Sequence, residues 1–316
     1  MRVSIQAGLA ALCALVALAG CASAPAPVAA DAPRREIALT YDDSPRDPGP
    51  FMDGPERARR IVAGLREAGV AEAMFFANPG HITGPEGEAR LRTFTDAGHV
   101  LANHSNTHPN LRDVTAEQYL ADVAEADRVL RPMKGFVPIF RFPYLSEGDT
   151  VEKRDAVRAG LIALGYAQGY VTTDSYDWRI DQLAREAVAA GKEIDMDALR
   201  DFYVRTAVES AGYYDRMAVA VLGRSPRHVM LLHETDLAAY FTPDLVAGLR
   251  ADGWTIIPAT EAFADPIATE MPNTLALSGG RVAAMMHERH AESRFTEQHG
   301  DWNSLTEPFE AQVVKH

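Results

Sequence analysis

The feature that most constrains the fold is an alternation of short apolar runs with longer segments of helical periodicity. Such alternation is typical of repeated strand–helix units, which build a parallel sheet. Strands are predicted at 36–41, 73–77, 99–103, 137–142, 167–173, 227–233 and 254–258. Seven parallel strands are close to the number that closes a barrel, so the predicted α/β fold is a distorted (β/α) barrel rather than an open sheet.

Helices are predicted between these strands, at 55–68, 116–130, 151–164 and 242–251. Two of them carry start signals. Thr115 and Gln118 have the spacing of a capping box, and Thr242-Pro243 places proline at the first helical position.

Length and periodicity divide the chain into a folded domain and a C-terminal tail. One folded domain is predicted over 36–264, with a helical insertion at 179–226 that contains helices at about 181–191 and 197–222. The periodicity fades in the C-terminal tail, 265–316. There His287 and His290 are interpreted as part of a solvated helix face, although two histidines three residues apart could also hold a metal.

The first 35 residues are predicted to lie outside the fold. Arg2 precedes an apolar run too short to span a membrane, which is typical of a signal peptide over 1–20. Leu18-Ala19-Gly20-Cys21 resembles the lipobox of bacterial lipoproteins, in which this cysteine carries the lipid; the alternative is an ordinary cleaved signal with a chance cysteine. The Ala/Pro-rich segment 21–35 would then be a tether. Because Ala22 rather than Asp follows the cysteine, we expect an exported protein anchored in the outer membrane, facing the periplasm.

Composition narrows the possible partners. The only two cysteines, Cys13 and Cys21, fall in this leader, so the fold has no disulfide and depends on its hydrophobic core. The formal net charge of −13 argues against nucleic acid as a partner. No protein partner can be inferred from the sequence.

Five polar clusters fall at or just after the ends of predicted strands, where barrel active sites are assembled. They occupy 40–45, 103–108, 140–144, 173–178 and 230–234. Each also has a structural interpretation, respectively a turn, an exposed histidine pair, an ion-paired arginine, a packed tryptophan and a core histidine.

The first three clusters complement one another chemically. Asp42 and Asp43 are adjacent carboxylates, which repel unless a cation or an arginine stabilises them. His104 and His108 share a face if they lie on one helical turn, as pairs of metal ligands often do. Arg141 lies inside an apolar strand and needs a carboxylate partner, for which Asp42 is the natural candidate.

Together, in this order, the five clusters resemble the five motifs of the NodB-like polysaccharide deacetylases, carbohydrate esterase family four. The resemblance covers roughly residues 37–263. It implies a distorted barrel and one divalent metal ion bound by Asp43, His104 and His108. With this ligand set zinc is the expected ion, although cobalt, nickel or manganese would also fit.

The resemblance also implies catalytic roles. Asp42 is the general base, and Arg141 keeps it ionised and oriented. The backbone N–H of Tyr144 contributes to the oxyanion site. His233 is the general acid, and an acid of the fourth cluster tunes it, Asp177 in preference to Asp174.

Three further residues are expected at the substrate. Trp178 and Leu231 would border the pocket for the acetyl methyl group, and Asp174 is either a substrate-binding or a structural residue. Tyr41 and Ser44 replace the family's usual Phe and Gly. Because serine lacks glycine's freedom at positive φ, we expect the loop 44–54 to take an unusual path along the groove rim.

The implied activity is removal of acetyl groups from an N-acetylglucosamine-containing glycan, by attack of a metal-activated water on an amide bond. Two alternatives remain open. One is an O-acetyl esterase that acts on a polysaccharide with the same residues, and the other is a carbohydrate-binding lipoprotein without turnover.

Overall fold

The computed structural model describes residue 1 and residues 34–81, 84–275, 279–290 and 301–315. The predicted signal peptide, Cys21 and nearly all of the tether therefore lie outside the described residues. Among the helices that are described, none is both long enough and apolar enough to span a membrane.

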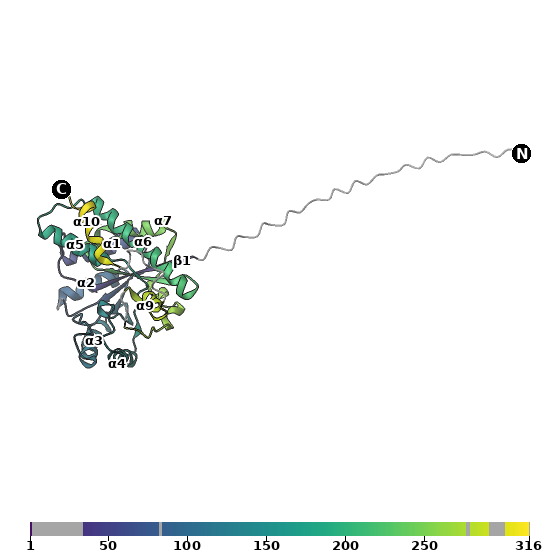
Figure 1. Cartoon of the computed structure of the whole chain (residues 1–316). Coiled ribbons are helices and arrows are strands. Elements are labelled where there is room, and N and C mark those ends of the chain that lie inside the picture. The colour runs from purple at the N-terminus through teal and green to yellow at the C-terminus, as the bar shows by residue number, and fades with distance from the viewer. Residues whose placement is uncertain (2–33, 82–83, 276–278, 291–300, 316) are drawn as a thin grey trace. The chain divides into compact units, whose positions relative to one another are not determined.

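Strands from residues 35–256 form one parallel sheet, with the order β5-β4-β3-β2-β1-β7-β6, and β8 pairs with the start of β1. The strands are β1 (Arg35–Ser44), β2 (Met74–Ala77), β3 (Val100–Asn103), β4 (Phe136–Phe140), β5 (Ala167–Gln168), β6 (Thr173–Asp174), β7 (Arg227–His233) and β8 (Trp254–Ile256). Helices surround this curled sheet (Figure 1). The predicted distorted (β/α) barrel is confirmed.

One predicted strand is wrong in an informative way. Residues 167–173 do not form a single strand, because β5 pairs with β4 at one end of the strand order whereas β6 pairs with β7 at the other. The residues between them carry the chain from one sheet edge to the opposite edge. This segment therefore takes the place of a continuous barrel strand.

The helices are α1 (Gly54–Glu67), α2 (Pro85–Asp96), α3 (Ala116–Leu130), α4 (Val151–Ala163), α5 (Asp177–Ala189), α6 (Met196–Leu222), α7 (Asp236–Ala251), α8 (Ala259–Ala262), α9 (Gly280–Glu288) and α10 (Thr306–Val313). Short 3-10 turns occur at η1 (Pro143–Leu145), η2 (Pro266–Thr269) and η5 (Trp302–Leu305). The capping box of Thr115 and Gln118 is present at the start of α3.

Two helix predictions need correction. The helix expected to begin at Thr242-Pro243 begins at Asp236, where the Thr235 side chain accepts a hydrogen bond from the Ala238 N–H. Pro243 therefore lies inside α7. Helix α2 was not predicted, because Gly84 caps it without a side-chain hydrogen bond.

Alternating residues of β1 pack on opposite faces of the sheet, as strand geometry requires. Ile37, Leu39 and Tyr41 belong to one apolar cluster, whereas Ala38 belongs to another. The C-terminal tail contributes to both clusters: Met285 and Met286 of α9 are buried in the second, and Phe309 of α10 is buried in the first. His287 and His290 are exposed, as predicted.

Candidate active site

A pocket of about 540 Å³ lies at the carboxyl ends of the strands, within the range usual for small-ligand sites (about 300–1,000 Å³). Nine of the eleven predicted site residues line it. These are Asp42, Asp43, His104, His108, Tyr144, Asp174, Trp178, Leu231 and His233. Arg141 and Asp177 do not line the pocket; they lie behind it, bonded to Asp42 and His233.

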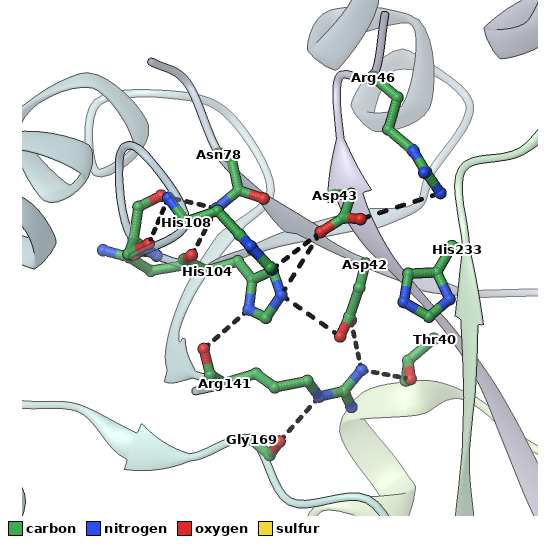
Figure 2. Close-up of polar contacts among 12 residues, drawn as sticks. Thr40, Asp42, Asp43, Arg46, Asn78, His104, His108, Arg141, Gly169 and His233 are labelled. Carbon is green, nitrogen blue, oxygen red and sulfur yellow. Dashed lines mark hydrogen bonds and ion pairs between the residues drawn. The ribbon is translucent and has the colours of Figure 1, made fainter. Parts of the chain in front are cut away.

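Asp43, His104 and His108 lie together at one side of the pocket (Figure 2). Their ligand atoms all lie within 4.8 Å of one another. Asp43 Oδ1 is 3.2 Å from Nε2 of His108 and 3.7 Å from Nε2 of His104. The structure thus brings together the three residues predicted to hold a metal.

His104 and His108 are in the neutral state in which a ring nitrogen can donate its lone pair to a metal. Nδ1 of His104 lies 2.8 Å from the Arg141 carbonyl oxygen, so Nδ1–H donates there and Nε2 is left unprotonated toward Asp43. Burial lowers the pKa of His104 to about 4. Burial and the neighbouring His104 likewise lower the pKa of His108 to about 4, so both imidazoles are neutral at pH 7.

These residues fit a divalent cation. Burial raises the pKa of Asp43, but His233, Arg46 and the two imidazoles outweigh that effect and hold the pKa well below its usual value. Its buried Oδ1 has no hydrogen-bond partner among the described residues. A carboxylate oxygen that faces neutral imidazole nitrogens repels them unless a cation lies between, and two nitrogens with one oxygen suit zinc-class ions.

Asp42 is held beside this group by Arg141. The guanidinium Nη1 donates to Asp42 Oδ1 at 2.5 Å and to the Thr40 hydroxyl at 2.9 Å (Figure 2). Both Asp42 and Arg141 are buried. Burial raises the pKa of Asp42 while Arg141 opposes that rise, and a carboxylate of raised pKa is a stronger base.

His233 faces Asp42 and Asp43 from β7 (Figure 2), in register with Asp42 on the neighbouring β1. Its Nδ1 is 2.8 Å from Asp177 Oδ1, and its backbone N–H donates to Asp177 Oδ2 at 2.7 Å. Burial alone would lower the pKa of His233, but Asp177 reverses this and raises the pKa to about 9. The imidazole therefore carries a proton at neutral pH that it can donate.

The remaining predicted residues form the pocket walls. Tyr144 is 64% exposed, and its ring centroid lies 4.5 Å from that of His108. Leu231 is buried and pairs in register with Asp174, whose pKa burial raises to about 6. Asp174 accepts a hydrogen bond from the Tyr176 N–H, so it also has a structural role in this turn.

Left-handed backbone conformations concentrate around the pocket. Among the pocket-lining residues other than glycine, positive φ angles occur at Asp43 (64°), His108 (56°), Tyr144 (58°), Leu145 (51°) and Tyr176 (57°). Such conformations are costly outside glycine and cluster at functional sites. In the first cluster the positive φ angle therefore occurs at Asp43, the predicted ligand, and not at the adjacent Ser44.

A buried charge network, Arg57, Arg90, Glu234 and Asp236, holds the loop 44–54 against the end of β7. Arg57 contacts both acids, at 3.4 Å to Glu234 and 3.0 Å to Asp236, and Arg90 donates to Glu234 at 2.9 Å. The loop backbone joins this network. The Arg46 N–H donates to Glu234, the Phe51 N–H donates to Asp236, and the carbonyl oxygens of Arg46 and Asp47 accept from Arg57.

Glycine is required where this loop passes closest to the network. A Cβ on Gly49 would lie 1.9 Å from Asp236, and one on Gly54 would lie 2.3 Å from Arg90. The loop therefore follows a path set by buried charges. It places the Arg46 guanidinium 3.9 Å from Asp43.

The pocket residues that sequence reasoning missed include Arg46, Asp181 and Trp302. Arg46 follows the first cluster closely, and Asp181 lies one helical turn after Trp178, so spacing alone was an available signal for both. Nothing in the tail sequence pointed to Trp302.

Comparisons with known proteins agree with this geometry. Residues 29–164 match the family model described as polysaccharide deacetylase. Over 112 residues the chain is 30% identical to the peptidoglycan-N-acetylglucosamine deacetylase of Bacillus cereus. This match covers 35% of this chain and 37% of that protein. Over 114 residues it is 29% identical to the chitin deacetylase of Colletotrichum lindemuthianum. That match covers 35% of this chain and 42% of the chitin deacetylase. The matches thus span less than half the length of these two relatives.

Solved structures share the fold. The Colletotrichum lindemuthianum chitin deacetylase has a TM-score of 0.51 and 19% identity over 75% of this chain and 91% of that chain. A CE4 family pseudoenzyme from Bacillus anthracis has a TM-score of 0.50 and 19% identity over 72% of this chain and 65% of that chain. At such identity these likenesses concern the fold alone. The sequence match is more specific: residues 29–164 of this chain are similar to the polysaccharide deacetylase family.

Proposed function

We propose that this protein is a metal-dependent hydrolase that removes acetyl groups from an N-acetylglucosamine-containing glycan. The observation that carries the proposal is one pocket that brings together the Asp43–His104–His108 group, a buried carboxylate, Asp42, beside that group, and a protonated imidazole, His233, in register with Asp42. A base, an acid and a cation site around one cavity are the parts that hydrolysis of an unactivated acetyl amide requires.

The metal site would be formed by Asp43 Oδ1 and the Nε2 atoms of His104 and His108. A divalent ion bound there would supply Lewis acidity and lower the pKa of water from 15.7 toward about 7–9. Zinc is the proposed ion because the ligand set is two nitrogens and one oxygen, although cobalt, nickel or manganese would suit the same ligands.

The chain's own residues would carry the proton transfers. Asp42 takes the proton of the attacking water, while Arg141 fixes the orientation of the carboxylate. The Tyr144 N–H is assigned to the oxyanion, where loss of one donor typically costs about 10²–10³ in rate. His233, held by Asp177, donates its proton to the leaving nitrogen.

A protonated His233, placed to act as general acid, favours an amide substrate over an ester. An amine is a poor leaving group without a proton, whereas an alkoxide needs the acid less. The names of the two sequence relatives, which specify peptidoglycan N-acetylglucosamine and chitin, support the same choice.

A panel of glycans scored for released acetate tests this proposal. We expect acetate from N-acetylglucosamine oligomers, and none from these oligomers with the matched variant Asp42→Asn. Acetate from acetylated xylan alone would instead identify an O-acetyl esterase. Binding of a glycan without acetate from any substrate would identify a carbohydrate-binding protein, an outcome made relevant by the pseudoenzyme that shares the fold.

We also propose that Cys21 carries a lipid that anchors the exported protein in the outer membrane, facing the periplasm. The support is the sequence Leu18-Ala19-Gly20-Cys21 followed by an Ala/Pro-rich segment. Two or more acyl chains hold a protein stably on a bilayer. We therefore expect Cys21→Ser to move from the membrane fraction to the soluble fraction of fractionated cells, and unchanged membrane association of this variant would contradict the anchor.

A further inference from the structure

We infer that Trp302, in the C-terminal segment, forms a second sugar-binding position beside the catalytic centre, so that the preferred substrate is an oligosaccharide. The inference deepens the proposed function and rests on it. Trp302 lies outside the five motif-like clusters and outside the segment that matches the family model.

Trp302 extends an aromatic wall inside the catalytic pocket. It lines the same pocket as Asp43 and His233, together with Trp178. The ring centroids of Trp178 and Trp302 are 5.5 Å apart at an interplanar angle of 58°. Trp302 is 40% exposed, so part of its apolar surface remains available to a ligand. The faces of sugar rings carry C–H groups that pack on such aromatic surfaces.

The position of Trp302 is fixed by the fold. The Arg179 guanidinium lies 5.2 Å from the Trp302 ring centroid and donates to the Thr306 hydroxyl at 2.9 Å. The following helix, α10, buries Phe309, and the Asp195 N–H donates to the Val313 carbonyl at 2.9 Å. Because the ring is held before a ligand arrives, little ordering cost opposes binding.

Helix α5 supplies polar groups beside this wall. Trp178, Asp181, Gln182 and Arg185 all line the pocket, and their i, i+3, i+4, i+7 spacing places them on one helix face. Asp181 is 2% exposed, and its buried Oδ1 has no hydrogen-bond partner among the described residues. An unsatisfied carboxylate oxygen is costly, and a sugar hydroxyl could donate to it.

These two observations point to one class of ligand. An aromatic surface next to an unsatisfied hydrogen-bond acceptor fits a ligand that is apolar on its ring face and hydroxylated at its edge, which describes a sugar. An acetylated sugar at the Asp43–His233 centre would place the next residue of its chain within the same pocket, over Trp302. The affinity should therefore increase with chain length.

The experiment compares N-acetylglucosamine and its tetramer. Calorimetry measures binding without turnover in two proteins: the Asp42→Asn variant, and the double variant that carries both Asp42→Asn and Trp302→Ala. We expect the Trp302 change to weaken tetramer binding about fivefold to tenfold, the size of an aromatic stacking contact, and to weaken monomer binding less. In the active protein the same change should raise the KM for the tetramer more than it lowers kcat. Trp302→Phe should restore most of the tetramer affinity.

Two further variants keep the test decisive. Val219→Ala removes apolar surface that is 45% exposed outside the pocket, and it should leave both affinities unchanged. Trp302→Gln retains a longer side chain than alanine but has no ring, and it provides the same comparison if the alanine variant is poorly folded. Equal tetramer affinity with and without the Trp302 ring would overturn the inference, as would equal losses for monomer and tetramer. Because binding is measured without turnover, this result is distinct from a failure to release acetate.

Discussion

Replacing Arg57 with leucine should destabilise the protein strongly. Arg57 is fully buried, and its guanidinium contacts Glu234, Asp236 and two backbone carbonyl oxygens of the loop 44–54. The network has two positive and two negative side chains, so the substitution leaves Glu234 paired with Arg90 alone and Asp236 without a cationic partner in the network. Breaking a buried ion pair from one side typically costs about 3–5 kcal/mol.

The assay is chemical and thermal unfolding, with an exposed arginine of the same helix as the control. At about 2–4 °C per kcal/mol for a domain of this size, Arg57→Leu should lower Tm by roughly 6–20 °C. The Arg59 side chain is 62% exposed and pairs with the partly exposed Glu56, so Arg59→Leu should change the free energy of unfolding by about 0.5 kcal/mol or less.

A double variant tests whether the cost arises from unpaired charge. Adding Asp236→Asn to Arg57→Leu removes one of the orphaned carboxylates, so the double variant should be more stable than the sum of the two single effects predicts. A loss below about 1 kcal/mol for Arg57→Leu alone would refute the reasoning, because the network would then contribute no more than a surface pair.

Two further predictions concern the pocket. Asp43→Asn should lose bound metal, whereas Asp42→Asn should keep the metal and lose most turnover. Both variants can be compared by metal content from mass spectrometry and by kcat. Loss of metal from Asp42→Asn but not from Asp43→Asn would show that the two roles are reversed. Asp177→Asn should lower the His233 pKa in the metal-free protein from about 9 toward its usual value of about 6.5, as NMR titration can measure. Since that pKa is raised in the folded state, the stability contributed by the pair is complete below about pH 6.5 and is lost as pH rises through about 9; an unchanged His233 pKa would contradict the assigned partner.

Much of the site could be predicted because its residues follow strand ends. Parallel strands present their carboxyl ends at one edge, so clusters distant in sequence, such as those with Asp43 and His104, meet there. The ion pair of Arg141 and Asp42 followed from a buried arginine's need for a carboxylate.

What could not be predicted depends on long-range packing. No local signal divides residues 167–173 between two sheet edges, because each strand piece, Ala167–Gln168 and Thr173–Asp174, is only two residues long. Pro243 resembled a helix start, but the earlier Thr235 cap determines where α7 begins. Trp302 reaches the pocket only because α10 packs back onto the domain, and tail periodicity carried no sign of that contact.

The most direct test of the account is acetate release from N-acetylglucosamine tetramer by protein stripped of metal and then reloaded with zinc. The proposed ligands lie at the rim of a large apolar core, so the fold should not depend on the ion. We predict that chelation abolishes acetate release while the far-UV circular dichroism persists, and that zinc restores the activity. Full acetate release after exhaustive chelation would contradict the account.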